Sequence, residues 1–141
     1  MKKVFVLGST GSIGINCLNV ISNLRSGFEV TGLTVNSNTE LLLEQIKIFK
    51  PKVIAVRDES AAKKISGKIP SSCELLVGEN GLIKAALETD YDIFMGAMVG
   101  FAWLAPTIEA IKRGKRIALA NKETLVVAGE IVTKLVLENS A

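Results

Sequence analysis

The most informative absence in this sequence is histidine, which does not occur among its 141 residues. Histidine supplies the general base of Ser-His-Asp triads and is the commonest metal ligand in proteins. Mechanisms that need a histidine base or ligand are therefore excluded within this chain. Cysteine is scarce too, because Cys17 and Cys73 stand alone without a CxxC motif. We expect neither a disulfide framework nor a cysteine nucleophile, and we expect a reducing compartment.

Long hydrophobic runs are also missing. The apolar run near the N-terminus covers only residues 4–7 before glycine and serine interrupt it, whereas the core of a signal peptide needs about 7–15 apolar residues. The uncharged window 93–108 contains Gly96, Gly100 and Pro106 and is shorter than the roughly 20 residues that span a bilayer. The sequence therefore predicts a cytoplasmic protein with no membrane partner.

Charge of one sign is not in large excess, since 17 lysines and arginines against 14 acidic residues give a net charge of +3. The one dense basic cluster is residues 112–116, with the sequence KRGKR. We interpret it as the end of a helix capped by Gly114 and followed by a strand. No aromatic residues are interleaved with it, so no nucleic-acid partner is expected.

Short apolar runs alternate with helical patterns along the chain. Strands are predicted at 4–7, 28–35, 53–56, 74–77, 92–97 and 116–120, and helices at 12–24, 39–50, 59–65, 82–87 and 104–112, with a last helix carrying Ala128, Val132 and Leu135. In the first helix the spacing of apolar residues predicts a buried face made of Ile13, Cys17, Val20, Ile21 and Leu24. This alternation predicts an α/β fold with a doubly wound, mainly parallel sheet. Because the chain stops after a helix, we expect a further region to be missing.

A glycine-rich turn, Gly8-Ser9-Thr10-Gly11-Ser12-Ile13-Gly14, joins the first strand to the first helix. Dinucleotide pyrophosphates bind at this place in Rossmann-type folds, where backbone N–H groups and the helix dipole favour an anion. Gly8 would permit the tight turn, Gly11 the approach of the phosphates and Gly14 close packing of the helix on the sheet. The spacing GxxGxxG in this context predicts nucleotide binding.

The residues after the second strand bear on the choice of cofactor. NAD-dependent enzymes usually place a carboxylate here, to bind the adenine ribose. This chain has Asn36-Ser37-Asn38-Thr39 instead, with no carboxylate before Glu40. A 2′-phosphate would not be repelled, so NADP is favoured over NAD, although Ser37 or Asn38 could equally be a helix cap.

Two further segments follow strands at the expected cofactor edge of the sheet. Asn121, Lys122 and Glu123 come directly after the last predicted strand, and either contact ligands there or form the solvated first turn of a helix. Residues 95–103 form a glycine-containing turn after another strand. We expect the methionine and aromatic side chains of this turn to lie in the core.

Together these segments resemble the 1-deoxy-D-xylulose 5-phosphate reductoisomerase family. The matching stretches are residues 7–14 (LGSTGSIG), 96–100 (GAMVG) with Leu104 and Pro106-Thr107, and 114–126 (GKRIALANKETLV). The last stretch is the most specific. The resemblance spans nearly the whole chain and implies that residues 1–141 are the N-terminal NADPH-binding Rossmann domain.

The resemblance also implies roles for individual residues. Thr10, Gly11, Ser12 and Ile13 would line the pyrophosphate and ribose of NADPH, Asn36, Ser37 and Asn38 would lie at its 2′-phosphate end, Asn121 and Glu123 would contact the cofactor, and Lys122 would contact the substrate. No catalytic residue and no metal ligand is assigned within this chain. Asn36 and Ser37 depart from the glycine-then-basic turn of the family.

The family converts a phosphosugar, 1-deoxy-D-xylulose 5-phosphate, by skeletal rearrangement and NADPH reduction into 2-C-methyl-D-erythritol 4-phosphate, a step of non-mevalonate isoprenoid biosynthesis. It needs Mg²⁺ or Mn²⁺, whose ligands begin in an Asp-Ser-Glu motif just beyond the end of this chain. The resemblance therefore implies that the catalytic, metal-binding and C-terminal domains lie outside the chain. The full enzyme would be a homodimer, and the fragment alone would bind NADPH weakly at best and be inactive.

Two alternatives remain to be weighed against this interpretation. Epimerase-type reductases share the GxxGxxG turn but need a Tyr-x-x-x-Lys pair, and Tyr91 is followed four positions later by Met95. A non-catalytic module that senses NADP(H) would need no catalytic residues. The polar residues 121–123 favour the enzyme over such a sensor.

Overall fold

The computed structural model describes residues 1–24, 26–98, 103–119 and 137–139. Strands and helices alternate along the chain in the predicted order. They are β1 (Lys2–Leu7), α1 (Ser12–Leu24), β2 (Phe28–Val35), α2 (Thr39–Phe49), β3 (Val53–Val56), α3 (Glu59–Ile65), the 3₁₀ turn η1 (Ser66–Lys68), β4 (Glu74–Val77), α4 (Gly78–Glu88), β5 (Ile93–Gly96), α5 (Leu104–Lys112) and β6 (Arg116–Leu119). The predicted strand 116–120 thus ends at its last described residue. The predicted last helix, with Ala128, Val132 and Leu135, lies outside the described residues.

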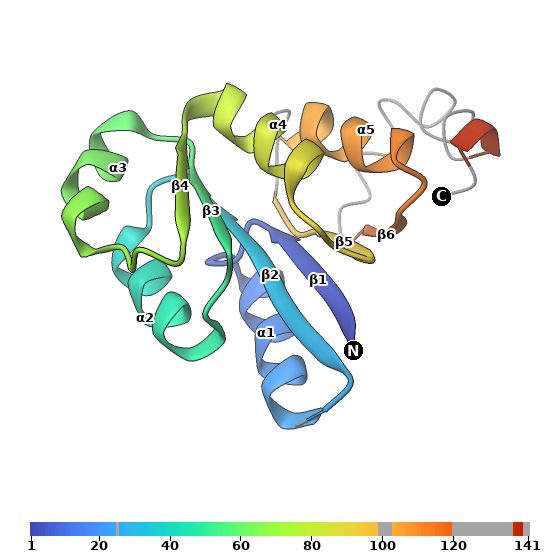
Figure 1. The fold of residues 1–141 in the computed structure, drawn as a ribbon, viewed down its shortest axis with the longest axis horizontal. Coiled ribbons are helices and arrows are strands. Elements are labelled where there is room, and N and C mark those ends of the chain that lie inside the picture. The colour runs from blue at the N-terminus through green and yellow to red at the C-terminus, as the bar shows by residue number, and fades with distance from the viewer. Residues whose placement is uncertain (25, 99–102, 120–136, 140–141) are drawn as a thin grey trace.

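The strands form one six-stranded sheet with the order β4-β3-β2-β1-β5-β6 (Figure 1). Every pairing is parallel. The chain builds outward from β1 to β4, then crosses back and continues on the other side of β1 with β5 and β6. This confirms the predicted doubly wound α/β fold, and it places the reversal of strand order between β1 and β5.

Two hydrophobic cores lie on the two faces of the sheet. One packs the sheet against α1, α2 and α3 through Leu18, Leu42 and Ile65, among others. The other packs it against α4 and α5 and contains the fully buried rings of Phe5, Tyr91 and Phe94. Strands buried on both faces explain the continuous apolar runs in the sequence. Among the described residues, no helix is long and apolar enough to cross a membrane.

The buried face of α1 differs from the predicted one. Ile13, Val20 and Leu24 are 41%, 57% and 50% exposed, whereas Gly14 and Leu18 are buried. Cys17 and Ile21 are half-buried and pack against the core as predicted. The prediction was wrong because it left out Leu18 and gave no weight to Gly14, which lies close against Gly8 and Ser9 in the turn after β1.

The basic cluster at residues 112–116 ends a helix, as predicted. Gly114 has φ +69°, and its N–H donates to the carbonyl of Ile111 over 2.9 Å. Arg113 donates from Nη1 to the carbonyls of Ala86 (2.7 Å) and Thr89 (2.9 Å) at the end of α4. Its guanidinium also lies over the ring of Tyr91, 4.6 Å from the centroid. Arg113 therefore ties α4 to α5.

The helix α4 begins four residues before the predicted start at Leu82, with Gly78 as its first residue. Gly78 and Gly81 lie in its first turn, and glycine is a weak helix former, so the sequence pattern there is faint. Trp103, which directly precedes α5, is buried, and Met95 within β5 packs against the core. Both agree with the prediction for residues 95–103.

Candidate functional site

A pocket of about 440 Å³ opens at the carboxyl ends of the central strands. Three segments line it: the turn after β1 with Gly8, Thr10, Gly11, Ser12 and Ile13, the turn after β2 with Asn36, Ser37 and Asn38, and Ala97 and Met98 after β5. The pocket thus lies where the strand order reverses, which is where open α/β sheets bind ligands. All seven described residues expected to bind the cofactor line this one pocket.

The turn after β1 is shaped by Gly8, which has φ +87°. A Cβ atom at this position would lie 2.9 Å from the backbone N and Cα of Met98. The Gly8 N–H donates both to the carbonyl (3.1 Å) and to Oγ1 (3.1 Å) of Thr34, and the Ser9 N–H donates to the same carbonyl over 2.9 Å. The end of β2 therefore holds the turn in place.

A second anchor comes from α2. The Ser9 hydroxyl donates to Gln45 Oε1 over 2.8 Å, and Gln45 Nε2 donates to the Ser9 carbonyl over 2.9 Å. Ser9 is fully buried and Gln45 nearly so. A buried amide whose two polar atoms are both paired to one residue fixes that residue's backbone, because leaving either unpaired costs free energy. These hydrogen bonds hold the turn after β1 in one conformation without a ligand.

Sequence reasoning missed both anchors, Thr34 and Gln45. The signal for Gln45 was its position three residues after Leu42 and one before Ile46, on the buried face of α2. A long polar side chain on an apolar face needs a buried partner. Thr34 carried no such signal, since threonine is common in buried strands.

The helix α1 starts directly at the pocket. Its first residue, Ser12, lines the pocket wall, and its first turn carries no acidic residue. The first N–H groups of a helix have no acceptor within the helix and carry its partial positive charge. Gly14 brings this end close to the turn, because a Cβ there would overlap the carbonyl oxygen of Gly8 and lie 2.8 Å from Ser9 Cα. A helix start placed in this way is suited to bind an anion.

The turn after β2 both caps α2 and lines the pocket. Asn38 caps α2, accepting a hydrogen bond at Oδ1 from the Leu41 N–H over 3.3 Å, which confirms the capping interpretation. Ser37 is exposed beside it, and the Asn36 carbonyl accepts from the Asp58 N–H over 2.9 Å. These residues present amide and hydroxyl groups to the pocket without a carboxylate among them.

Met98 packs against the second core, as predicted, and it also lines the pocket beside Ala97. Asn121, Lys122 and Glu123 lie outside the described residues. β6, however, ends at Leu119, paired with Gly96 at the end of β5, at the same edge of the sheet as the pocket.

The cysteines lie outside the pocket. Burial raises the pKa of the Cys73 thiol to about 11 and also raises the pKa of the Cys17 thiol. A thiol with a raised pKa is a poor nucleophile at neutral pH, as predicted. Among the residues that the structure describes, no group of three or more histidine, cysteine, aspartate or glutamate side chains is placed to hold a metal ion.

Comparison with known proteins gives consistent matches. Residues 4–129 match the family model described as 1-deoxy-D-xylulose 5-phosphate reductoisomerase. Proteins of that name from Thermoanaerobacter pseudethanolicus and Chloroherpeton thalassium are 52% and 48% identical over 96% and 99% of this chain. The chain covers 35% and 36% of their respective lengths.

Solved structures agree with these sequences. The reductoisomerase from Zymomonas mobilis in complex with NADPH superimposes with a TM-score of 0.91 at 37% identity, over 98% of this chain and 36% of that one. A reductoisomerase in complex with NADPH, fosmidomycin and magnesium gives a TM-score of 0.90 at 33% identity, over 100% of this chain and 35% of that one. This chain spans about a third of the length of each.

Proposed function

The chain belongs to the 1-deoxy-D-xylulose 5-phosphate reductoisomerase family, and from this premise we propose that residues 1–141 are the NADPH-binding domain of such an enzyme. The intact enzyme would rearrange 1-deoxy-D-xylulose 5-phosphate and reduce the product to 2-C-methyl-D-erythritol 4-phosphate. The observation that carries the proposal is the pocket at the reversal of strand order, where a rigid glycine turn meets the start of α1.

The residues around the pocket fit a dinucleotide. Thr10, Gly11, Ser12 and Ile13 bind the pyrophosphate and the neighbouring ribose, with backbone N–H groups at the start of α1 as donors. Asn36, Ser37 and Asn38 lie at the 2′-phosphate end and offer neutral polar groups. Thr34 accepts a hydrogen bond from the Gly8 N–H and Gln45 donates one to the Ser9 carbonyl, and these keep the turn in its binding conformation, so little conformational entropy is lost on binding.

The segment after β6 would supply the substrate side of the site. We assign cofactor contacts to Asn121 and Glu123 and a substrate contact to Lys122, whose ammonium group suits a phosphate or a polarised oxygen. The end of β6 beside β5 supports this assignment, since the chain enters the segment at the edge of the sheet that bears the pocket.

The chemistry is divided between this domain and the rest of the enzyme. Bound NADPH supplies the hydride, and a Mg²⁺ or Mn²⁺ ion held by residues beyond this chain polarises substrate oxygens. The residues of this chain bind and orient the nicotinamide cofactor. For the intact enzyme we also propose a cytoplasmic location and a homodimeric state. The free thiols of Cys17 and Cys73 support the first, and the family resemblance supports the second, which the mass in solution tests.

The decisive experiment follows NADPH oxidation by the intact protein. We expect absorbance of NADPH to fall only when 1-deoxy-D-xylulose 5-phosphate and Mg²⁺ are both present, and 2-C-methyl-D-erythritol 4-phosphate to form in equal amount. The 141-residue chain alone should give no turnover. Product formation without NADPH consumption, or no product from the intact protein, would contradict the proposal.

A binding measurement combined with the turnover assay separates the enzyme from the NADP(H)-sensing module. A ligand at 100 times its Kd stabilises a protein by about 2.7 kcal/mol, so thermal shifts report binding directly. Both interpretations predict a shift with NADPH. Binding by the intact protein without any substrate-dependent turnover would favour the sensor.

A further inference from the structure

A second pocket, of about 320 Å³, adjoins the nucleotide pocket. The two pockets share Ser37 and Asn38 in the turn after β2. The far wall of the second pocket is formed by α3 and η1, which contribute Lys64 and Lys68, and the start of α2 contributes Glu40. A ligand in the first pocket can therefore extend past Ser37 and Asn38 into a basic recess.

The two lysines give this recess an excess of positive charge. Both side chains are exposed, and within the described part of the chain neither forms an ion pair. By contrast Arg57, which follows β3, is bound to Glu79 over 2.8 Å. Glu40 is the one carboxylate on the pocket wall, so the recess carries a net charge of +1 from two cations and one anion.

The position of the recess indicates which part of a bound dinucleotide would reach it. With the pyrophosphate at the start of α1, the adenosine ribose of a dinucleotide lies at the end of the second strand. Here that place is Asn36-Ser37-Asn38, which offers no cation. A phosphate on the ribose 2′-oxygen would point beyond these residues, and an isolated dianion favours nearby lysine ammonium groups.

We propose that Lys64 and Lys68 bind the 2′-phosphate of NADPH and set the preference of this protein for NADPH over NADH. The inference rests on the proposed cofactor function and names the residues that make it selective. It also accounts for a binding turn without a basic residue, because the cations reach the phosphate from the neighbouring helix. Glu40 opposes them and moderates the affinity.

The test replaces both lysines in the intact protein, as Lys64→Gln/Lys68→Gln, and titrates NADPH and NADH by fluorescence. An exposed ion pair contributes up to about a fivefold change in affinity, so the Kd for NADPH should rise roughly 5- to 30-fold. The Kd for NADH should stay unchanged. Added salt should weaken NADPH binding in the wild type more than in the double variant, since it screens exposed charges.

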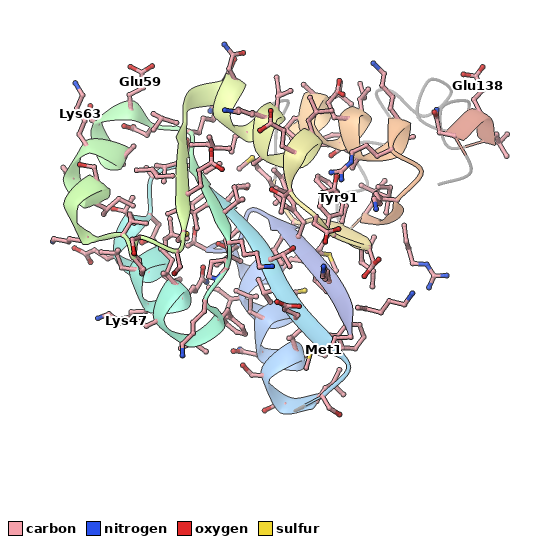
Figure 2. The ribbon with its side chains drawn as sticks, in the orientation of Figure 1. Met1, Lys47, Glu59, Lys63, Tyr91 and Glu138 are labelled. Atoms are coloured by element: carbon pink, nitrogen blue, oxygen red, sulfur yellow. The ribbon has the colours of Figure 1, made fainter. Side chains whose placement is uncertain are left out.

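Matched controls come from lysines that lie near the recess without lining it. Lys63 is the neighbour of Lys64 on α3, and its side chain extends outward on the side of Glu59 (Figure 2). Lys47 lies further along α2 (Figure 2). Lys63→Gln and Lys47→Gln remove the same charge and should leave both dissociation constants unchanged. Glu40→Gln should tighten NADPH binding and leave NADH binding unchanged.

The outcomes separate this inference from the proposed function. If the wild type prefers NADPH and the double variant keeps the same ratio of the two constants, the lysines do not bind the phosphate and the cofactor function stands. An equal loss of NADH affinity would also overturn the inference, because it would indicate damage to the whole site. If the wild type binds neither nucleotide, the proposed function itself fails.

Discussion

Substituting two glycines of the same turn should separate folding from binding. At Gly14 an added Cβ would overlap the Gly8 carbonyl oxygen and lie 2.8 Å and 2.9 Å from the Cα and carbonyl carbon of Ser9. At Gly11 the nearest atoms to such a Cβ are the carbonyl oxygens of Gly8 at 3.8 Å and Ala97 at 3.9 Å, which is ordinary van der Waals contact. Gly14→Ala is therefore a packing variant, and Gly11→Ala places a methyl group in the nucleotide pocket.

The loss of stability expected for Gly14→Ala depends on whether the atoms near the added methyl group can move. The atoms that Gly14→Ala meets belong to the backbone, and the hydrogen bonds between Ser9 and Gln45 hold that backbone in place. Overpacking of this kind typically costs about 1–3 kcal/mol, and overlap with backbone lies at the upper end. Replacing a helical glycine by alanine stabilises the helix by about 1 kcal/mol, which offsets part of this cost. We expect a net loss of about 2 kcal/mol, which lowers the urea midpoint by about 1 M.

Gly11→Ala should weaken NADPH binding and leave the stability of the fold almost unchanged. Its free energy of unfolding should stay within about 0.5 kcal/mol of the wild type, because the methyl group meets no close neighbour. Its Kd for NADPH should rise at least tenfold, since the methyl group stands between the turn and the pyrophosphate. Urea unfolding of the chain and fluorescence titration of the intact protein measure the two quantities. Equal stability of Gly14→Ala and the wild type would refute the packing argument, and unchanged NADPH affinity of Gly11→Ala would refute the placement of the pyrophosphate.

Three further substitutions test the other contacts. Gln45→Leu leaves the hydroxyl and carbonyl of Ser9 buried without their partner, so it should cost about 2 kcal/mol in urea unfolding and weaken NADPH binding. Arg113→Ala removes two hydrogen bonds to the end of α4 and should lower stability by about 1–2 kcal/mol, whereas Lys112→Ala removes an exposed ion pair and should change it by less than about 0.5 kcal/mol. Cys73, with a pKa of about 11 against an ordinary 9.0, should react with iodoacetamide at pH 8 roughly a hundredfold more slowly than an unperturbed thiol, as mass spectrometry with and without urea will measure.

The same thiol predicts the direction of a pH effect. The folded state disfavours the thiolate of Cys73, so its contribution to stability is complete below pH 9.0 and is lost as the pH rises toward 11. The variant Cys73→Ala should show a smaller alkaline loss. Burial also raises the pKa of Tyr91, so some loss should remain. Fast alkylation of Cys73 in the folded chain, or equal stability of Arg113→Ala and Lys112→Ala, would contradict these contact assignments.

The fold was predictable because most of its elements have a strong local signal. Residues 4–7 of β1 and all of β3 form uninterrupted apolar runs, and α2 ends before Pro51 as the sequence requires. The glycine turn could be placed because strand, turn and helix occur in the right order. The four cofactor positions predicted in this turn and the three predicted after β2 all line one pocket.

What sequence reasoning could not supply depends on contacts between distant segments. The orientation of α1 is set by how closely Gly14 approaches the turn. The periodicity of apolar residues does not predict such a contact, because glycine has no side chain. Gln45 reaches Ser9 across 36 positions, and Lys64 lines the same pocket as Ser37 only because α3 packs beside α2. Such partners are chosen by the sheet topology, which a local pattern does not encode.

The strand order also has a consequence for synthesis of the protein on the ribosome. β1 is translated first but finishes in the middle of the sheet, with β2 on one side and β5 on the other. The half from β1 to β4 pairs only strands that follow one another in the chain, so we expect it to assemble while β5 is still being made. During that interval β1 has an open edge, which is a template for wrong pairing. The pocket is also incomplete during that interval, because Ala97 and Met98, which line it, follow β5 in the chain.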